Sequence, residues 1–294
     1  MTAGRGSWMG VESPAAELER ARWPRLTGEP QPPLRSLLPR GYVGYTEATT
    51  PRHLILPASA AVLLVVKLAD SPYRPPRFII GAHGGYSVLE GNCAPSYLEV
   101  SLAPLGAYTL LGLPMDQLSG RTVDLADLLG ADGRRLADQL REAPAWRRRF
   151  ALLDEFLLPR LERGPRPSAE VGWAWRRLVT TGGLVPIRRI AREVGWSPRH
   201  FIAKFKQQVG LRLKTAARLI RFDGVWRRLD QRKLLDWADI ARDAGYADQA
   251  HLIRDFRQFT GTTPAKLARR LPARPDGRGQ DEVNSVQDAA AASA

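Results

Sequence analysis

The sequence Ile-Ala-Arg-Glu-Val-Gly-Trp at residues 190–196 returns as Ile-Ala-Arg-Asp-Ala-Gly-Tyr at residues 240–246. Each copy then continues with an apolar residue, a phenylalanine and a glycine, which are Phe201, Phe205 and Gly210 in the first copy and Leu252, Phe256 and Gly261 in the second. The copies lie 50 positions apart up to the aromatic residue and 51 apart after it, so the second has one extra residue in its turn. Such a repeat predicts one structural unit used twice.

Each copy has the pattern of a helix, a tight turn and a second helix. In the first copy, apolar residues recur at i, i+3, i+4 and i+7 from Ile187, which is one face of a helix. Gly195 can end that helix in the left-handed conformation, and Ser197 followed by Pro198 is a strong helix start. In the second copy Gly245 and Asp248 provide the same two signals. The pattern predicts two helix-turn-helix units, whose second helices can enter a DNA major groove.

Residues 168–271 closely resemble the DNA-binding domain of the AraC/XylS family of bacterial transcription regulators. The resemblance rests on the repeated Ile-Ala-x-x-x-Gly-aromatic pattern and on Gly-Thr-Thr-Pro at residues 261–264, which precedes a short basic helix. Residues 218–221 resemble the helix that joins the two units in that family. A single helix-turn-helix is a weak motif, whereas two at this spacing are specific. The alternative is a helical bundle with repeated packing.

The distribution of charge favours the DNA-binding interpretation. The chain has 44 Lys and Arg against 30 Asp and Glu, a formal net charge of +14. Residues 168–275 hold 23 of the basic and 9 of the acidic residues, so the rest of the chain is neutral overall. Solubility alone does not require this segregation, whereas a phosphate-binding domain does.

The remaining composition predicts a cytoplasmic protein. The single Cys93 excludes a disulfide within the chain and suggests a reducing compartment. No apolar run approaches the ~20 residues that span a bilayer, and the N-terminus lacks the pattern of a signal peptide. We therefore expect no membrane association.

Residues 41–129 predict an antiparallel barrel or sandwich. Short apolar runs at residues 54–56, 61–68, 78–80 and 97–102 are separated by Pro and Gly about every ten positions. In the last run Tyr97, Glu99 and Ser101 alternate with apolar residues, which predicts one wetter face. Residues 97–114 and 123–130 also resemble the N-terminal domain of one AraC-type subfamily, which implies a small β-barrel sensor but no particular ligand.

Residues 131–163 return to a helical pattern. Trp146, Phe150, Leu153 and Leu157 fall at i, i+4, i+7 and i+11, a near-heptad stripe that suits a contact between two subunits. The stripe can equally pack on the barrel of its own chain. We assign these four residues to homodimerisation and keep the second interpretation open.

Base recognition is expected from the outward faces of the two second helices. In the first helix those positions are Arg199, Ile202, Ala203, Lys206 and Gln207, and in the second they are Gln249, Arg254 and Arg257. Arginine and glutamine can donate to base edges, whereas Ala203 and Ile202 can only contact a thymine methyl group or read shape. The family often has a longer polar residue at the position of Ala203. Phosphate contacts are expected from Arg188, Arg189, His200, Lys204 and Arg242.

An enzyme is the weaker interpretation. His53 and His83 could approach Glu47, Glu90 or Glu99 in a barrel, but the His-x-His pair of metal-dependent barrels is missing. Gly84-Gly85 is a turn, and Cys93 has no basic neighbour that would activate its thiol. We expect neither a metal nor a cofactor nor catalytic residues. The alternative that remains is a β-barrel enzyme or small-molecule binding protein with an accessory helical domain.

Together these patterns predict an α+β protein that is a sequence-specific, DNA-binding transcriptional regulator. Residues 1–38 are expected to be disordered, 39–163 to form a small antiparallel β-barrel or sandwich with helices, and 164–167 to form a linker. Residues 168–273 are expected to form an all-α domain with helix-turn-helix units at about 186–210 and 236–261, and 274–294 a disordered tail. The expected partners are double-stranded DNA, a second copy of the chain, RNA polymerase and a small-molecule effector.

Overall fold

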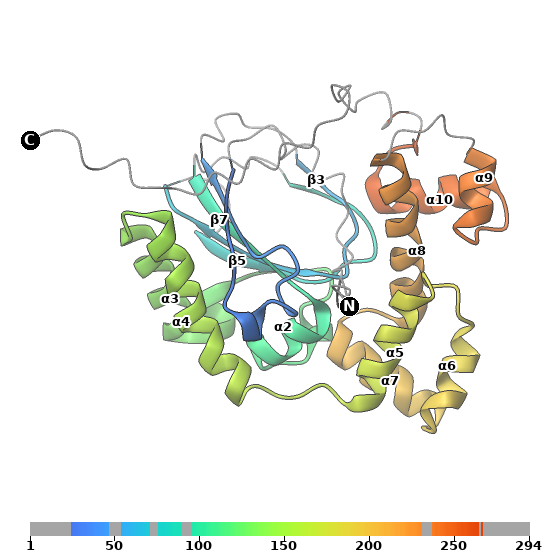
Figure 1. The fold of residues 1–294 in the computed structure, drawn as a ribbon, viewed down its shortest axis with the longest axis horizontal. Helices are drawn as coiled ribbons and strands as arrows, with labels where there is room; N and C mark the ends of the chain where they lie inside the picture. Colours follow the sequence, from blue (N-terminus) through green and yellow to red (C-terminus); the bar gives the residue numbers. More distant parts are fainter. Residues whose placement is uncertain are drawn as a thin grey trace, which may run out of the picture.

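An antiparallel sheet with covering helices and a separate group of helices make up the computed structural model (Figure 1). The structure describes residues 25–46, 54–70, 76–89, 96–230, 237–264 and 266, and the side chains of residues 54, 55, 88, 89 and 226–230 are outside that description. The predicted fold class, an N-terminal β domain followed by an all-α domain, is confirmed. His53, Glu47, Glu90, Cys93, the first 24 residues and the tail from residue 274 lie outside the described residues.

The main sheet has six strands in the order β1-β2-β7-β4-β5-β8, and all its pairings are antiparallel. The strand bounds are β1 Arg25–Gly28, β2 Tyr42–Thr46, β4 Val62–Lys67, β5 Arg77–Ile80, β7 Ser96–Leu102 and β8 Thr122–Asp124. Strands β3 (Leu54–Leu56) and β6 (Ser87–Leu89) form a second, two-stranded sheet. The strands predicted around residues 54–56, 61–68, 78–80 and 97–102 are all present.

The expectation of a wetter face on β7 is wrong. Glu99 and Ser101 are only 3% and 2% exposed, and Tyr97 is equally buried. The reason is that β7 lies inside the sheet, between β2 and β4, with both faces covered. On the face that carries Tyr97, an apolar cluster forms with Tyr45 at 4.6 Å between ring centroids and with Leu56 of the second sheet.

The N-terminal boundary of the β domain also needs correction. Residues 25–38 were expected to be disordered, but β1 pairs with β2, and the 3-10 helix η1 (Pro32–Leu34) follows it. Leu34 and Leu38 are buried among the sheet and helix residues of the domain core. These two apolar side chains, set among the prolines of the segment, hold it in place.

Two long helices cover one face of the sheet (Figure 1). These are α3 (Leu125–Glu142) and α4 (Trp146–Arg163), preceded by α2 (Pro104–Leu111) and the 3-10 helix η2 (Met115–Gln117). Helix α3 includes a kink at Gly130, whose φ of 61° is in the left-handed region that favours glycine. The helical pattern predicted for residues 131–163 is confirmed.

The structure supports the second interpretation of the α4 stripe, in which it packs on the β domain of its own chain. Leu153 and Leu157 are 0% and 3% exposed within the single chain, because they pack into the core beneath the sheet. Trp146 and Phe150 lie directly on Gly44 and Gly28, where a β-carbon would overlap their rings. The two glycines open space on β1 and β2 for the aromatic rings, so the stripe packs on its own domain.

A buried carboxylate reinforces this attachment of α4. Asp154 accepts hydrogen bonds from the hydroxyl of Tyr42 at 2.8 Å and from the backbone N–H of Gln31 at 3.0 Å. Burial and the neighbouring Asp154 raise the pKa of Tyr42 well above its ordinary value, so the phenol stays a donor. One side chain of α4 thereby anchors both β2 and the start of η1.

The C-terminal part is helical throughout its described residues. Its helices are α5 Ala169–Thr180, α6 Ile187–Val194, α7 Pro198–Val209, α8 Leu213–Asp230, α9 Trp237–Asp243 and α10 Gln249–Thr260. Figure 1 shows the pair α6–α7 and the pair α9–α10 at opposite ends of α8. Among the described residues, no helix has the length and apolar character needed to cross a membrane.

Candidate nucleic-acid interface

The two helical pairs repeat one local structure. Helix α6 ends directly before Gly195 and α9 ends two residues before Gly245, and the φ angles of these glycines, 75° and 71°, are in the left-handed region. The following helices, α7 and α10, end at Gly210 and Gly261, again with left-handed φ angles. The four positions are the glycines of the sequence repeat, so the repeat encodes two copies of the same turn-and-stop geometry.

The helix starts are equivalent as well. Ser197 accepts a hydrogen bond from the backbone N–H of His200 at 3.3 Å, and Asp248 accepts one from His251 at 2.6 Å. Each capped helix therefore begins at the same point after its turn. Ala247, the extra residue of the second copy, is accommodated before the cap.

Each unit also has an aromatic–histidine pair at the start of its second helix. We call these second helices, α7 and α10, the recognition helices. Trp196 contacts His200 edge to face at 4.7 Å between ring centroids, and Tyr246 contacts His251 in the same way at 5.1 Å. The aromatic residue comes from the turn and the histidine from the first turn of the recognition helix. These pairs fix the entry of α7 and α10 relative to the preceding helices.

A shared apolar cluster joins the two units, and a second cluster around Ile240, Ala241 and Leu252 lies within the second unit. Phe201 and Phe205 of α7 lie in the same buried cluster as Phe256 of α10. Phe222 of α8 contacts Phe256 and Phe259 edge to face, at 5.2 Å in both cases. Leu219 of α8 is in the same cluster, so Leu219 and Phe222 place α8 in the core that both units share. The side chains of Trp226 and Leu229, on the same helix, lie outside the described residues.

All the positions predicted to read bases are on the molecular surface. In α7, Arg199, Ala203 and Lys206 are exposed, Gln207 is half-buried, and Ile202 is an exposed apolar residue with 47% of its surface accessible. In α10, Gln249, Arg254 and Arg257 are exposed. The core side of each helix is formed by its phenylalanines, so these residues face away from the core. Their roles in base recognition remain predictions.

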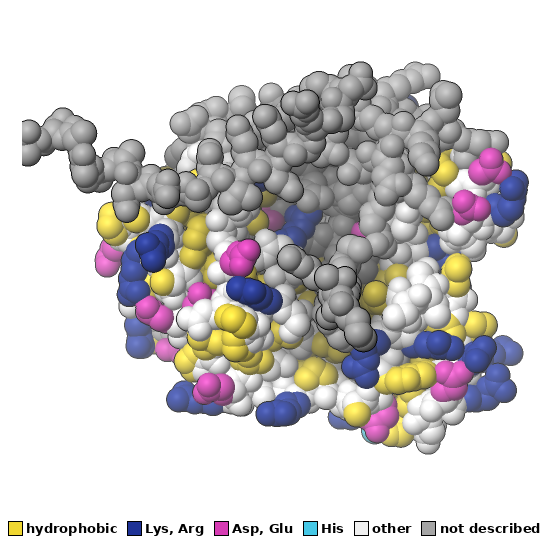
Figure 2. All heavy atoms as spheres, viewed as in Figure 1, with side chains coloured by type: hydrophobic (Ala, Val, Ile, Leu, Met, Phe, Trp, Pro, Cys, Tyr) yellow, Lys and Arg dark blue, Asp and Glu magenta, His cyan; other side chains and the backbone are white. Residues whose placement is uncertain are grey.

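The predicted phosphate contacts are also accessible, and several have partners within the chain. Arg189 pairs with Glu193 at 2.6 Å, and Arg242 pairs with Asp239 at 2.9 Å. Lys204 donates to Gln207 at 3.2 Å, which links a predicted phosphate contact to a predicted base contact. Arg188 and His200 are exposed as well. Figure 2 shows Lys and Arg side chains gathered over the part of the surface where Figure 1 places α6 and α7.

Sequence patterns did not identify the ion pair that holds α10 to α8. Arg218 contacts the buried carboxylate of Asp255 through two nitrogens, at 3.2 and 2.6 Å, and also donates to Gln258 at 2.6 Å. The sequence does contain one indication of this pair. Asp255 follows Leu252 by three positions and precedes Phe256, which places a charge on the buried face of the helix. Such a charge requires a partner.

The β domain contacts both recognition helices at their C-terminal ends. The loops of the sheet meet α10 through backbone hydrogen bonds from Ala58 to the carbonyl of Phe259 at 2.8 Å and from Tyr86 to that of Gln258 at 3.1 Å. On the other unit, Gly210 at the end of α7 lies against Met115 of η2. The β domain therefore touches both units and constrains their separation.

Gln208 shows how α7 is also fixed to the start of the helical domain. Its buried amide oxygen accepts hydrogen bonds from the backbone N–H and the hydroxyl of Ser168, at 3.0 and 3.2 Å. Ser168 is the residue that precedes α5. The neighbouring Gln207 is half-buried, so the two adjacent glutamines lie in different environments.

Within the described ranges, no group of three or more His, Cys, Asp or Glu side chains is arranged to hold a metal ion. His83, one of the candidates, instead directs its two ring nitrogens at the carbonyls of Gly81 and Pro57, at 3.0 and 2.9 Å. Its position is structural, beside the loop that meets α10.

Comparison with known proteins finds a match to residues 190–270 of the helical domain. Residues 190–270 match a family model described as a helix-turn-helix domain. Similar solved structures include the C-terminal domain of AraT, a response regulator from Geobacillus stearothermophilus, with 19% identity over 40% of this chain and 98% of that chain and a TM-score of 0.36. ToxT from Vibrio cholerae O395 is 10% identical over 75% of this chain and 88% of that chain, with a TM-score of 0.39. Among curated proteins, no relative matches the sequence.

Proposed function

We propose that this chain, whose residues 190–270 are an AraC-type helix-turn-helix domain, regulates transcription by reading two short DNA blocks, one with α7 and one with α10. DNA binding and transcriptional regulation follow from that domain. We further propose that α7 and α10 each recognise one of the two DNA blocks, through the residues named below.

The observation that carries the proposal is the duplicated geometry on one rigid support. Both recognition helices start at equivalent caps, end at left-handed glycines and pack on the same helix α8. Each presents an arginine away from the core, Arg199 in α7 and Arg254 in α10. An arginine fork at the edge of guanine is the commonest specific contact in the major groove.

The charge distribution supports the same proposal. The excess of positive charge lies in residues 168–275, and exposed basic residues flank both recognition helices. Arg188, Arg189, His200, Lys204 and Arg242 supply the phosphate contacts that fix the register on the duplex. A basic surface of this kind gives affinity, while the outward faces of α7 and α10 give the sequence preference.

The partners of the regulator are part of the proposal. We infer a homodimer that binds double-stranded DNA in the cytoplasm, contacts RNA polymerase and responds to a small molecule through the β domain. Leu153 and Leu157 are buried, and Trp146 and Phe150 are partly buried against the core of their own domain. We therefore infer that the homodimer uses a different surface from these four residues. The contacts of the β domain with both recognition units support a regulatory role for that domain.

Selection on randomised duplex DNA with the full chain tests the proposed function. The expected result is a site with two conserved blocks and an affinity that falls steeply with salt, because each neutralised phosphate releases counterions with a slope of about −0.9 per contact. A single short block, or an affinity that salt does not change, would contradict it. The isolated sequence of each block can then be tested in a mobility-shift titration.

A further inference from the structure

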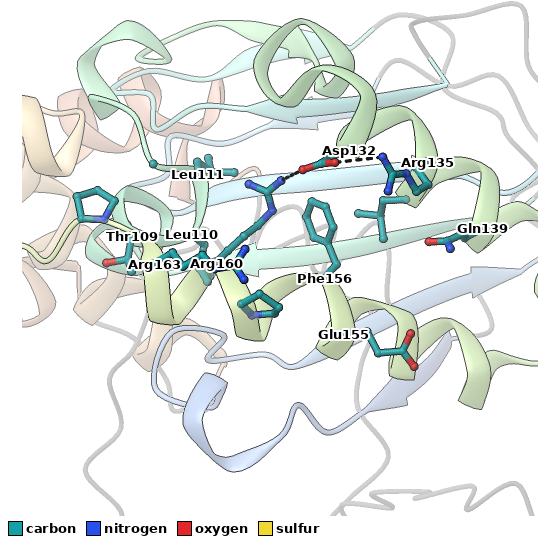
Figure 3. A pocket seen from close by; sticks show the side chains of 15 residues that line it. Thr109, Leu110, Leu111, Asp132, Arg135, Gln139, Glu155, Phe156, Arg160 and Arg163 are labelled. Carbon is teal, nitrogen blue, oxygen red and sulfur yellow. Dashed lines mark hydrogen bonds and ion pairs between the residues drawn. The ribbon is translucent and has the colours of Figure 1, made fainter.

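A polar cavity lies where the β domain passes into the helical domain. Its volume is about 510 Å³, and its walls come from α2, α3, α4 and the linker residues Gly164 and Pro165. Figure 3 shows Arg160 reaching from α4 toward Asp132 of α3, with Arg135 on the other side of that carboxylate. Neither the DNA-binding surface nor the sheet core accounts for this cavity.

The charges around the cavity are unbalanced. Arg160 donates to one oxygen of Asp132 at 3.0 Å, while Arg135 contacts the other at 3.5 Å, so two guanidinium groups share one carboxylate. Glu155 also lines the cavity, but its carboxylate is engaged by Arg148 at 2.6 Å. Three arginines therefore face one available acid once Arg163 is included.

Arg163 is the group that points to a ligand. It lines the cavity at the last residue of α4 and has no hydrogen-bond or ion-pair partner within the part of the chain that the structure describes. The Arg163 side chain is exposed, so the empty cavity does not contain an unpaired buried charge. Arg135, Arg160 and Arg163 carry three positive charges, and Asp132 supplies one negative charge. The cavity therefore lacks two negative charges.

Arg160 is partly desolvated in this arrangement, with 23% of its side chain exposed. It lies over the ring of Phe156 with its guanidinium carbon 4.4 Å from the ring centroid, and burial lowers its pKa below the ordinary value although Asp132 opposes that shift. A partly buried guanidinium can be stabilised by additional charge-assisted hydrogen bonds, and its planar fork fits two oxygens of one anion.

We propose that this cavity binds a small phosphomonoester, with the phosphate held by Arg160 and Arg163 and the organic part against Leu111, Phe156 and Pro159. A phosphomonoester carries a charge of about −1.5 to −2 at pH 7, which matches the missing charge better than a single carboxylate does. Apolar walls beside convergent cations are the usual composition of a small-molecule site. The cavity is within the ordinary volume range of such sites, about 300–1,000 Å³.

The position of the cavity suggests what the ligand does. Gly164 has no room for a side chain because a β-carbon would overlap the carbonyl of Thr109, so the linker and α2 are in direct contact at the cavity wall. Helix α2 in turn packs on α7. A bound anion joins α3, α4 and the linker, and thereby the β domain to the first recognition unit. This regulatory part rests on the proposed function, whereas the binding site does not.

Calorimetric titration of the full chain, without DNA, tests the site. Phenyl phosphate is the probe, with inorganic phosphate as the charged part alone and phenol as the neutral body. Arg163→Gln should weaken phenyl phosphate about 10- to 100-fold, since it removes charge-assisted hydrogen bonds from an exposed residue without disturbing the fold. Arg147→Gln is the matched control, because Arg147 is exposed on the same helix but does not line the cavity.

The variant Asp132→Asn tests whether Arg160 and Arg135 form a ligand site or only structural ion pairs with Asp132. Removing the competing carboxylate should tighten phenyl phosphate about tenfold, because the anion then faces unshared guanidinium groups. The proposed binding site is overturned if phenyl phosphate does not bind, or if phenol binds equally well. It is also overturned if Arg163→Gln behaves like Arg147→Gln, or if Asp132→Asn weakens binding.

The regulatory part has a separate test. It is overturned if phenyl phosphate binds but leaves the affinity of the chain for a selected DNA site unchanged. If the full chain shows no sequence-specific DNA binding, the proposed function fails, but the proposed phosphomonoester site does not.

Discussion

Arg218 of α8 holds Asp255 of α10 with two parallel hydrogen bonds, from Nε to Oδ2 at 3.2 Å and from Nη2 to Oδ1 at 2.6 Å. The Asp255 side chain is 4% exposed, and Arg218 is 25% exposed. The same guanidinium lies over the ring of Phe259, 5.0 Å from its centroid. This pair fixes the second recognition helix to the helix that joins the two units, so it constrains where α10 can meet DNA.

Removing this carboxylate should destabilise the second unit. Asp255→Asn leaves Arg218 without its charged partner, and we expect a loss of about 1–3 kcal/mol, below the value for a fully buried pair because Arg218 is partly solvated. Urea unfolding followed by circular dichroism measures it. Asp239→Asn is the control, since its pair with Arg242 is exposed and should contribute less than about 1 kcal/mol. Equal losses in the two variants would contradict this prediction.

Leu153→Glu should disrupt the β domain rather than separate two subunits. Leu153 is fully buried against the sheet, and an unpaired carboxylate there should cost about 4 kcal/mol or more. Near-ultraviolet circular dichroism and urea unfolding report this loss, with Arg147→Glu as the exposed control on the same helix. If Leu153→Glu yields a folded monomer from a dimeric parent, then the stripe serves association after all.

The helical repeat could be predicted from the sequence because its signals are local. Gly195 and Gly245 need only their own backbone conformation to end a helix, and Ser197 and Asp248 need only the backbone three residues ahead. The spacing of Phe201 and Phe205 then defines the buried face. Each element of the unit is therefore encoded within a few residues, which explains why the positions of α7 and α10 agree with the sequence pattern.

Long-range contacts explain where the sequence patterns failed. The stripe on α4 is equally compatible with a partner helix or with a sheet, and its location is decided by Gly28 and Gly44, more than a hundred positions earlier. The alternation of polar and apolar residues along β7 shows that the strand has two different faces. It does not show that both faces are covered, because the cover over Tyr97 includes Leu56 of a distant strand. The cavity that includes Arg160 combines α2, α3, α4 and the linker, and no local pattern predicts that combination.

The contact between the β domain and α10 should weaken in acid. His83 lies beside this contact, and burial lowers its pKa below the ordinary value of 6.5, although the carbonyls of Gly81 and Pro57 favour the charged form. The unfolded chain therefore binds the proton more readily, so this contribution to stability is complete above about pH 6.5 and is lost as the pH falls through the folded pKa.

Unfolding free energies measured between pH 7.5 and pH 5 test this linkage. The decrease toward pH 5 should be smaller in His83→Gln than in the parent chain, because glutamine does not titrate. His200→Gln is the control, since His200 is an exposed residue of α7. A parent chain and a His83→Gln variant with the same pH dependence would show that His83 does not contribute.

The two recognition helices should act on separate base pairs. Arg199 and Arg254 are exposed on α7 and α10, which lie toward opposite ends of α8, and successive major grooves on one DNA face are about 34 Å apart. Each arginine should therefore read one of two blocks whose centres are about ten base pairs apart. Arg254→Ala should cost about 1–3 kcal/mol and relax specificity at one block, and Arg199→Ala should do so at the other. Lys204→Ala should weaken binding to all sequences alike, because a phosphate contact carries no base information. Selection on randomised DNA with the three variants distinguishes these outcomes, and the division fails if Arg199→Ala and Arg254→Ala relax the same base pairs.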